Sequence, residues 1–295
     1  MKKELTQIEF KKLEKANKLE QIRKLYIQEL YEDNTSLFRE SDRAKERKLI
    51  YDITNNGKEK DILVLSDIHL PFHHKEALEE ALKTPADIVV INGDFFDCYS
   101  LSVFKKEQLI QLTDEIDLGN LVLKKILNKG YDHILMLNAN HEARAMKFLA
   151  NKLSGHEDLY TEISKSFSML KTLKENNRVL KTEGWWFKTG QLIFAHPDWF
   201  SRVTLRTVQN TYEYFIQTGE DFEAICNGHT HGLGFTPFRR KILMESGCLC
   251  RGMDYLHSGQ RRFVEAHVGW SVLHLDKKCH FDFNKSKQYF HSFSG

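Results

Sequence analysis

The chain has 295 residues, of which 41% are hydrophobic and 28% are charged. This length accommodates one large domain with a sizeable core, or a domain with an accessory segment. The 43 basic and 41 acidic residues give a formal net charge of +2, so charge alone indicates neither a nucleic-acid nor a membrane partner. The sequence contains no apolar run of membrane-spanning length, and its charged N-terminus lacks the apolar core of a signal peptide.

The cysteines do not form an evident disulfide framework. No two of the five form a C-x-x-C pair, and only Cys248 and Cys250 lie close together in the sequence. A lone C-x-C spacing is weak evidence for a metal site, so ordinary buried thiols are the preferred interpretation. We therefore expect a reducing, cytoplasmic environment and no membrane partner.

Residues 1–58 are predicted to form a helical extension. Thr6 and Glu9 fit a capping box, and an apolar stripe follows on an otherwise charged helix. The turn at Asn55-Asn56-Gly57 marks the end of the extension, after a second predicted helix over residues 38–53. The stripe must pack against the catalytic domain, a partner or a second copy of the chain, so a homo-oligomer is one expected arrangement. Its members are Ile8, Leu13, Ala16, Leu19, Ile22, Leu25 and Leu30.

From residue 60 onward, short apolar runs rich in branched residues alternate with helical patterns. Continuous apolar runs are typical of strands that are buried on both faces, and the alternation predicts an α/β architecture with a mixed sheet. We place this domain at residues 59–276 and expect a loosely held C-terminal tail at residues 277–295. The runs are Ile62–Leu65, Ile88–Ile91, Ile134–Leu137, Leu192–Phe194, Ala224–Cys226 and Ile242–Met244, and the helical patterns are His74–Lys83, Leu118–Asn128 and Ala143–Lys152.

Most of these apolar runs are followed immediately by residues of the types that bind metal ions. Loops at the carboxyl ends of strands converge on one edge of an α/β domain, where binding sites form. The D-x-H and H-x-H spacings also place both side chains on the same side of an extended segment. Each motif is weak alone, but their joint occurrence at strand ends predicts a metal site. The motifs are Asp67-Ile68-His69, Gly93-Asp94-Phe95-Phe96-Asp97, Asn140-His141-Glu142, His196 and Gly228-His229-Thr230-His231.

This ordered series of motifs resembles the calcineurin-like metallophosphoesterase superfamily over roughly residues 60–250. The resemblance implies a four-layer α/β/β/α sandwich with two metal ions. Asp94 would bridge the ions, and His141 matches the family's histidine beside the leaving group. The residues that match the family's ligands are Asp67, His69, Asp94 and His231 for one ion, and Asp94, Asn140, His196 and His229 for the other.

The ligand types support a pair of divalent cations independently of the resemblance. Two cations about 3.5–4 Å apart can clamp a phosphate and activate a bridging water. Mixed imidazole and carboxylate ligands suit transition metals better than calcium, so we expect manganese, with iron, zinc, nickel or magnesium as alternatives. His141 is predicted to assist the leaving oxygen, and Asp97 is predicted to orient a ligand rather than to bind metal.

Two positions depart from the family's pattern. Ala139 stands where the family usually has a glycine before Asn-His-Glu, and we expect a small backbone adjustment there rather than loss of the site. Cys98 stands where protein phosphatases and dinucleotide-polyphosphate hydrolases of the superfamily carry an arginine that grips a phosphate. The missing arginine favours a diesterase over a monoesterase, unless an arginine elsewhere in the chain compensates.

The predicted function is a two-metal phosphodiesterase that uses a metal-bridging hydroxide and acts on nucleic acid, either DNA or RNA. A weaker likeness to bacteriophage-type members of the superfamily, most evident at residues 245–250, also indicates nucleic-acid metabolism. The alternatives are a phosphomonoesterase or nucleotide hydrolase and, in another class, a non-catalytic scaffold with the same fold.

Basic and aromatic residues offer further, ambiguous indications of a polyanionic substrate. Basic side chains attract nucleic acid if they line the rim of the site, but they equally suit a solvated face. Aromatic rings stack on bases or belong to the core. The basic residues are Arg239, Arg240, Lys241, Arg251, Arg261 and Arg262, and the aromatic residues are Trp185, Trp186, Trp199, Phe200 and Tyr255.

Overall fold

The computed structural model describes residues 35–102, 108–156, 159, 163, 169–170, 176–251 and 266–291. The chain divides into two compact units, Met1–Lys48 and Leu49–Gly295. Helix α2 (Thr35–Thr54) contains the second predicted helix, and its last turn buries Ile50 in the core of the second unit, before the expected boundary at residue 58. The predicted apolar stripe lies outside the described residues. Within them, no helix has the length and apolarity needed to cross a bilayer.

The larger sheet has the strand order β11-β10-β1-β2-β3-β4. Strands β1 to β4 pair in parallel, whereas β10 and β11 continue the sheet in antiparallel fashion. The central strands are buried on both faces, which explains why their sequences are continuously apolar. The strands are β1 (Lys60–Leu65), β2 (Ile88–Ile91), β3 (His133–Met136), β4 (Val179–Lys181), β10 (Gly269–Leu275) and β11 (Phe281–Phe290).

The smaller sheet has the strand order β5-β6-β7-β9-β8. Strands β6, β7 and β9 are parallel to one another, and β5 and β8 are antiparallel edge strands. Three predicted strands therefore form the parallel centre of this sheet. The strands are β5 (Trp186–Thr189), β6 (Leu192–Ala195), β7 (Ala224–Asn227), β8 (Leu233–Phe238) and β9 (Lys241–Ser246).

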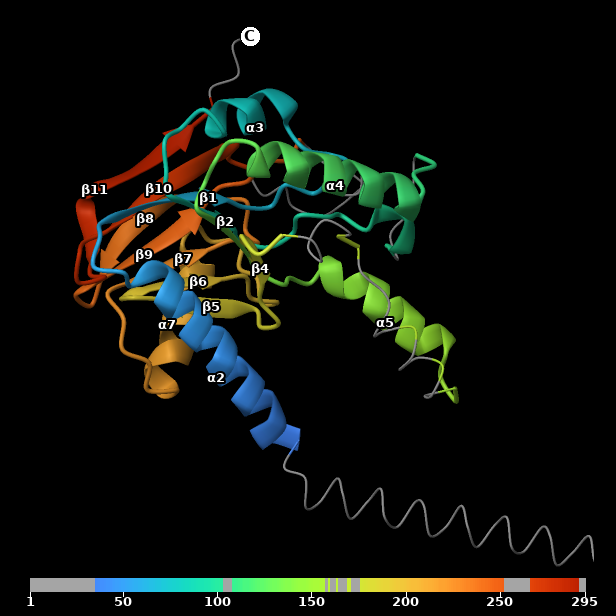
Figure 1. The fold of residues 1–295 in the computed structure, drawn as a ribbon, viewed down its shortest axis with the longest axis horizontal. Coiled ribbons are helices and arrows are strands. Elements are labelled where there is room, and N and C mark those ends of the chain that lie inside the picture. Colours follow the sequence, from blue (N-terminus) through green and yellow to red (C-terminus); the bar gives the residue numbers. More distant parts are fainter. Residues whose placement is uncertain are drawn as a thin grey trace, which may run out of the picture. The chain divides into compact units, whose positions relative to one another are not determined.

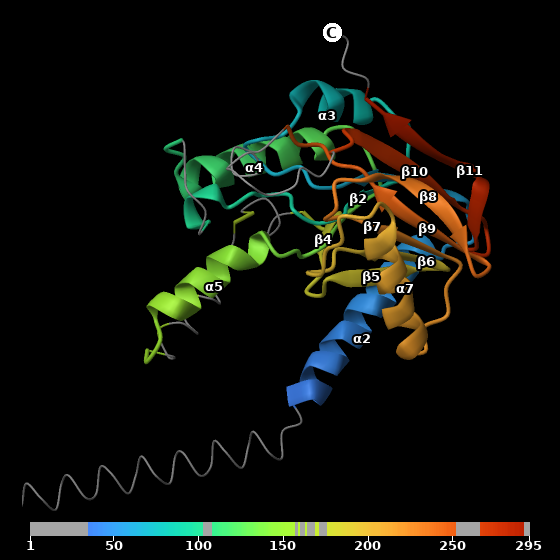
Figure 2. The same cartoon turned by 180° about the vertical axis from the view of Figure 1, so that it is seen from behind.

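The two sheets face each other, and helices cover their outer faces (Figures 1 and 2). Val64 of β1 and Phe194 of β6 share the core between the sheets. On the outer face of the larger sheet, Leu63 packs in a cluster with helices α3 (Lys75–Ala81) and α4 (Leu112–Leu127). On the outer face of the smaller sheet, Ile193 packs in a cluster with α7 (Arg206–Gln217). The predicted four-layer α/β/β/α sandwich is therefore confirmed.

The prediction of a loose C-terminal tail from residue 277 is wrong for Phe281–Phe290, which form strand β11. This strand pairs with β10 at the edge of the larger sheet, and the rings of Trp270 and Tyr289 stack with their centroids 5.4 Å apart. Much of β11 is exposed, so its sequence carries polar residues where a central strand carries apolar ones. The predicted boundary at residue 276 therefore falls inside a β-hairpin.

The packing of α4 against the loop after β2 gives a test of the fold. A methyl group on Gly119 would lie 2.1 Å from Cε1 of Phe96, whose side chain is buried. Overpacking of this kind costs about 1–3 kcal/mol, whereas alanine's helix propensity returns at most about 1 kcal/mol. Gly119→Ala is therefore expected to lower the free energy of unfolding, measured in urea. Leu121→Ala, at an exposed position of the same helix, is the control, and an unchanged stability of Gly119→Ala would show that Phe96 moves aside.

Candidate metal centre

The predicted ligands all lie on loops that leave the carboxyl ends of parallel strands. The loops are joined directly, because His69 N–H donates to the carbonyl of Asp94 at 2.9 Å. Asn92 Nδ2 also donates to the carbonyl of Cys226 at 3.2 Å, which links the larger sheet to the smaller one at this edge. The ligands follow their strands in this order: Asp67 and His69 after β1, Asp94 after β2, Asn140 after β3, His196 after β6, and His229 and His231 after β7.

Asp94 lies at the centre of the cluster. Its Oδ2 atom is 3.6 Å from Nε2 of His69 and 3.2 Å from Nε2 of His196. The same oxygen lies 3.7 Å from Nε2 of His141, which is the predicted catalytic histidine. One carboxylate therefore faces a candidate ligand of each predicted ion, which is the position that a bridging ligand needs.

Asp67, His69 and His231 converge on one side of Asp94. Oδ1 of Asp67 is 3.3 Å from Nε2 of His231 and 3.8 Å from Nε2 of His69. The two imidazole Nε2 atoms lie 3.2 Å apart. Three electron-pair donors thus surround one small volume, and together with Asp94 they match the first predicted ligand set.

On the other side of Asp94, donor atoms of His196 and His229 lie within 4.8 Å of that carboxylate. His196 Nδ1–H donates to the carbonyl of Asn92 at 2.8 Å, so the other ring nitrogen, Nε2, faces the cluster. Within the described part of the chain, Oδ1 of Asn140 is buried without a hydrogen-bond partner. Buried polar atoms normally have a partner, so this atom fits a metal ligand.

Asp97 orients two of the histidines. Its Oδ1 atom accepts from Nδ1 of His69 at 3.0 Å, and its main-chain carbonyl accepts from Nδ1 of His141 at 2.9 Å. Each ring therefore turns its Nε2 atom toward Asp94. Partners of this kind fix the tautomer and the direction of a metal-binding imidazole, which is the role that the sequence predicts for Asp97.

The backbone of the centre is strained where the ligands leave their strands. Positive φ angles are costly for non-glycine residues and persist only where the surrounding structure enforces them. The ligands with positive φ are Asp67 (50°), His69 (48°), Asp94 (48°), His229 (78°) and His231 (58°).

Glycines make room for the ring of His196. A Cβ atom would lie 2.2 Å from Nδ1 of His196 if added to Gly93, and 2.7 Å from it if added to Gly228. Ala139, where the family usually has glycine, is not among the residues with positive φ. Its methyl group therefore fits an ordinary backbone conformation, and the G-D and G-H glycines carry the steric requirement.

The buried charges perturb one another strongly. Burial favours the neutral form of Asp94, but the charges of His141 and His196 outweigh it and hold the pKa of Asp94 well below its usual value. Burial also opposes the charge on His196, yet Asp94 and Asp67 raise its pKa to about 9. For His229, burial and the nearby His196 lower the pKa to about 4. In the metal-free protein at neutral pH, His196 is therefore a positively charged imidazolium and His229 is a neutral imidazole.

Two residues that are absent from the predicted ligand set also belong to the site. Arg144 donates from Nη1 to the carbonyl of Asp97 at 2.9 Å, and its Nη2 atom lies 2.9 Å from Nε2 of His141. It follows His141 by three residues on helix α5 (Glu142–Lys152), and this spacing was the available signal. Cys250 is a buried thiol, as preferred, but its Sγ atom lies 3.7 Å from Nδ1 of His231.

The basic run at residues 239–241 does not line the rim of the site. Ile242 of β9 pairs with Ala224, the first residue of β7, whereas His229 follows the last residue of β7. The run therefore lies at the amino ends of these strands, opposite the carboxyl ends that carry the predicted ligands. Arg251 forms an ion pair with Glu76 at 2.7 Å, and residues 261–262 lie outside the described residues.

The aromatic candidates divide into core and surface residues. Trp185 and Trp186 pack against the cluster beneath α7, and Trp199 packs against Trp185 with ring centroids 5.1 Å apart. Phe200 is 46% exposed, and its ring centroid lies 6.0 Å from that of His229. Phe200 is therefore placed to meet a ligand at the centre. Tyr255 lies outside the described residues.

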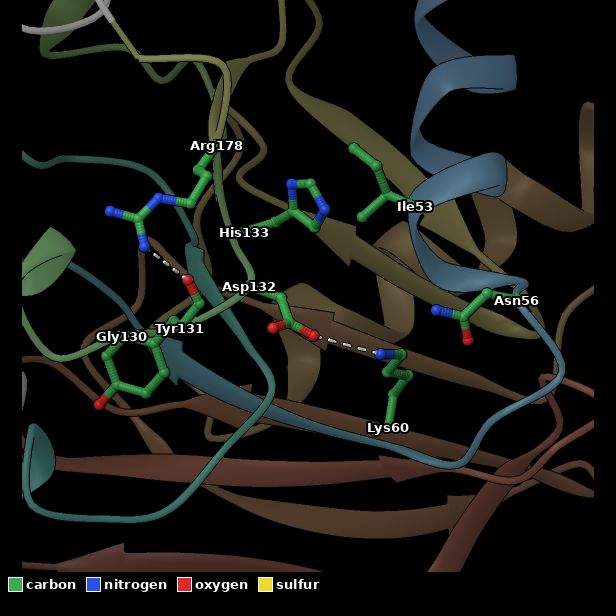
Figure 3. A pocket seen from close by; sticks show the side chains of 8 residues that line it. All are labelled: Ile53, Asn56, Lys60, Gly130, Tyr131, Asp132, His133 and Arg178. Atoms are coloured by element: carbon green, nitrogen blue, oxygen red, sulfur yellow. Dashed lines mark hydrogen bonds and ion pairs between the residues drawn. The ribbon is translucent and has the colours of Figure 1, made fainter.

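A separate pocket lies at the amino ends of the parallel strands of the larger sheet (Figure 3). Its cationic side chains already have partners: Lys60 lies 3.5 Å from Asp132, and Arg178 donates to the carbonyl of Tyr131 at 3.4 Å. No predicted ligand lines this pocket. The residues that line it are Ile53, Asn56, Lys60, Gly130, Tyr131, Asp132, His133 and Arg178.

The sequence profile of the family described as calcineurin-like phosphoesterase matches residues 60–233. The chain belongs to the calcineurin-like phosphoesterase family. The matched segment contains every predicted metal ligand and His141. Membership identifies the protein as a metal-dependent phosphoesterase. This agrees with the phosphoesterase activity that the sequence motifs predict.

Solved structures with a similar fold share little sequence with the chain. Vacuolar protein sorting 29 from Cryptosporidium parvum is 12% identical, with 81% of this chain and 100% of that chain covered and a TM-score of 0.43. An archaeal phosphodiesterase is 14% identical, with coverage of 78% and 99% and a TM-score of 0.40. A metallophosphoesterase from Sphaerobacter thermophilus is 13% identical, with coverage of 79% and 88% and a TM-score of 0.40. Among curated proteins, no match was found.

The lack of space for a side chain between Gly93 and His196 gives a test of the centre. Gly93→Ala would place a methyl group 2.2 Å from Nδ1 of His196 at a position with positive φ, so this ring must move. We expect the purified variant to bind less metal than wild type, measured by elemental analysis after dialysis. Ala139→Gly is the matched control and is expected to keep the wild-type metal content. Full metal content in Gly93→Ala would show that His196 is not needed as a ligand.

Protons and metal ions are expected to compete for His196. Its pKa of about 9 in the metal-free protein means that binding of a cation at Nε2 must displace a proton near neutral pH. The affinity for Mn²⁺ should therefore rise as the pH is raised from about 6 to about 9, by at most about tenfold per unit for one displaced proton. Calorimetric titration in buffers of different ionisation enthalpy measures both quantities. A pH-independent affinity without proton release would contradict the assignment of His196.

Proposed function

We propose that this protein is a two-metal phosphodiesterase that acts on nucleic acid. The observation that carries the proposal is the position of Asp94, whose Oδ2 atom lies 3.2 Å from Nε2 of His196 and 3.6 Å from Nε2 of His69. The proposed ligands are Asp67, His69, Asp94 and His231 for one ion, and Asp94, Asn140, His196 and His229 for the other. When bound, a pair of divalent cations, with manganese expected, supplies Lewis acidity toward the phosphoryl oxygens and an acidified water as nucleophile.

His141 is the proposed catalytic residue on the leaving-group side. Its ring is held by the hydrogen bond from Nδ1 to the carbonyl of Asp97, which leaves Nε2 beside Asp94. When the ring carries its second proton, Nε2–H can donate to the departing oxygen. Asp97 therefore positions His141 and His69 together, so the proton donor and a metal ligand share one support.

One observation supports a diester substrate, and a second supports nucleic acid. Position 98 offers no phosphate clamp, because the Cys98 thiol is buried in the core and lies 3.8 Å from Sδ of Met169. The exposed ring of Phe200 near His229 offers a surface on which a base can stack.

The location and assembly of the protein are parts of the same proposal. All five cysteines are free and buried, which supports the expected reducing cytoplasm. Residues 1–58 are the proposed element for homo-oligomerisation, on the strength of the apolar stripe in their sequence.

The activity can be tested on purified protein supplied with Mn²⁺. We expect cleavage of bis(p-nitrophenyl) phosphate and of oligonucleotides, with loss of activity in EDTA. Asp94→Asn should abolish most of the turnover, and His141→Ala should lower kcat by about 10²–10⁴-fold, the usual contribution of a positioned proton donor. Single- and double-stranded DNA and RNA are compared in the same assay.

Other outcomes of this assay would replace the proposal. Turnover of p-nitrophenyl phosphate without any diester cleavage would indicate a phosphomonoesterase or nucleotide hydrolase. Absence of both bound transition metal and metal-dependent activity would indicate a non-catalytic scaffold. Diester cleavage without cleavage of any oligonucleotide would retain the diesterase and reject nucleic acid as its substrate.

A further inference from the structure

Arg144 is a cationic side chain beside the metal centre that the predicted ligand set does not use. It lies one helical turn after His141 on α5, and its guanidinium contacts the carbonyl of Asp97 and Nε2 of His141, each at 2.9 Å. The Arg144 side chain is 20% exposed, compared with 8% for His141 and 2% for Asp94. The Arg144 side chain is therefore more exposed to solvent than the two site residues beside it.

The guanidinium keeps hydrogen-bonding capacity for a ligand. An arginine has five N–H donors and binds phosphate or carboxylate oxygens as a fork. Within the described part of the chain, its hydrogen bonds go to Asp97 and His141 alone. The contact with His141 is also exchangeable, because Nε2 of His141 must release it in order to meet the leaving oxygen of a substrate.

Neutralisation of Asp97 does not account for the position of Arg144. The closest guanidinium contact on Asp97 is the main-chain carbonyl at 2.9 Å, whereas Oδ2 of the carboxylate is 3.8 Å away. The carboxylate already has ring partners in His69 and His141. The guanidinium of Arg144 therefore lies closer to the main chain of Asp97 and to the ring of His141 than to the Asp97 carboxylate.

We propose that Arg144 binds a second phosphate on the leaving-group side of the scissile diester, so that the site prefers substrates in which a further phosphate follows the cleaved bond. This inference rests on the proposed function, in which His141 faces the leaving oxygen. In this proposal, the anion at Arg144 lies beyond His141 and is a different group from the phosphoryl group that would be attacked. In a polynucleotide, that position belongs to the next phosphate of the backbone.

The proposal also explains how the site works with a buried thiol at position 98. The Cys98 side chain points into the core, so an anion-binding group cannot reach the site from there. Arg144 approaches the same loop from α5, through the carbonyl of the neighbouring Asp97. It brings a guanidinium to the centre on the side of the leaving group.

The test compares dinucleotides that differ only in a terminal phosphate. Wild-type protein with Mn²⁺ is assayed on TpT, pTpT and TpTp, and kcat/KM is measured for each by chromatography. We expect the isomer with its extra phosphate on the leaving-group side to be preferred over TpT by about tenfold or more, the value of one hydrogen bond to a charged group. Arg144→Ala should bring this ratio close to one, and Arg144→Lys should retain part of it.

The ratio separates binding of a second phosphate from a purely structural role. Misplacement of His141 lowers kcat/KM for all three dinucleotides and cancels in the ratio. Lys147→Ala removes the same charge from an exposed position one turn further along α5 and should leave the ratio unchanged. If Arg144→Ala does not fold, Arg144→Gln, which keeps a donor for the carbonyl of Asp97, takes its place.

The outcomes distinguish this inference from the proposed function. If wild-type protein cleaves neither bis(p-nitrophenyl) phosphate nor a dinucleotide, the proposed function fails. If it cleaves bis(p-nitrophenyl) phosphate but shows no preference for the extra phosphate, or a preference that survives Arg144→Ala, only the role of Arg144 is overturned.

Discussion

The structure depends on the burial of several carboxylates within one cluster of imidazoles. The side chains of Asp67, Asp94 and Asp97 are almost completely buried, and like charges placed together in a low-dielectric interior are unstable without compensation. Positive charge must therefore reach the cluster, either as protons on the histidines or as metal ions. The perturbed pKa values of Asp94 and His196 reflect this requirement in the metal-free protein.

The fold holds this cluster together at the meeting edge of its two sheets. Parallel strands deliver all their carboxyl ends to one edge, so short loops suffice to gather ligands from distant parts of the sequence. The cost appears in the backbone, because Asp94 and four other proposed ligands have positive φ, and in the glycines that leave space for His196. The packed cores on both sides of each sheet hold these strained conformations in place.

The accuracy of the sequence-based predictions followed how strongly each segment is constrained by burial. Central strands such as β1 and β2 are buried on both faces, and their apolar runs predicted them closely. Strand β11 has much exposed surface and a polar sequence, so it was taken for a tail. The basic run at residues 239–241 was a candidate for the rim, but strand pairing placed it at the far edge. The sequence does not show directly how far a surface segment lies from the site in the folded chain.

The sequence by itself determined the fold class, the family and the chemical types of the candidate ligands, because a D-x-H or G-H-x-H motif at a strand end is a local feature. Only the tertiary structure decided which atoms meet. It placed Asp94 between the two histidine groups, directed the thiol at position 98 into the core, and brought Arg144 against the main-chain carbonyl of Asp97. These relations depend on the pairing of strands and the packing of helices, which act between residues that are remote in the chain.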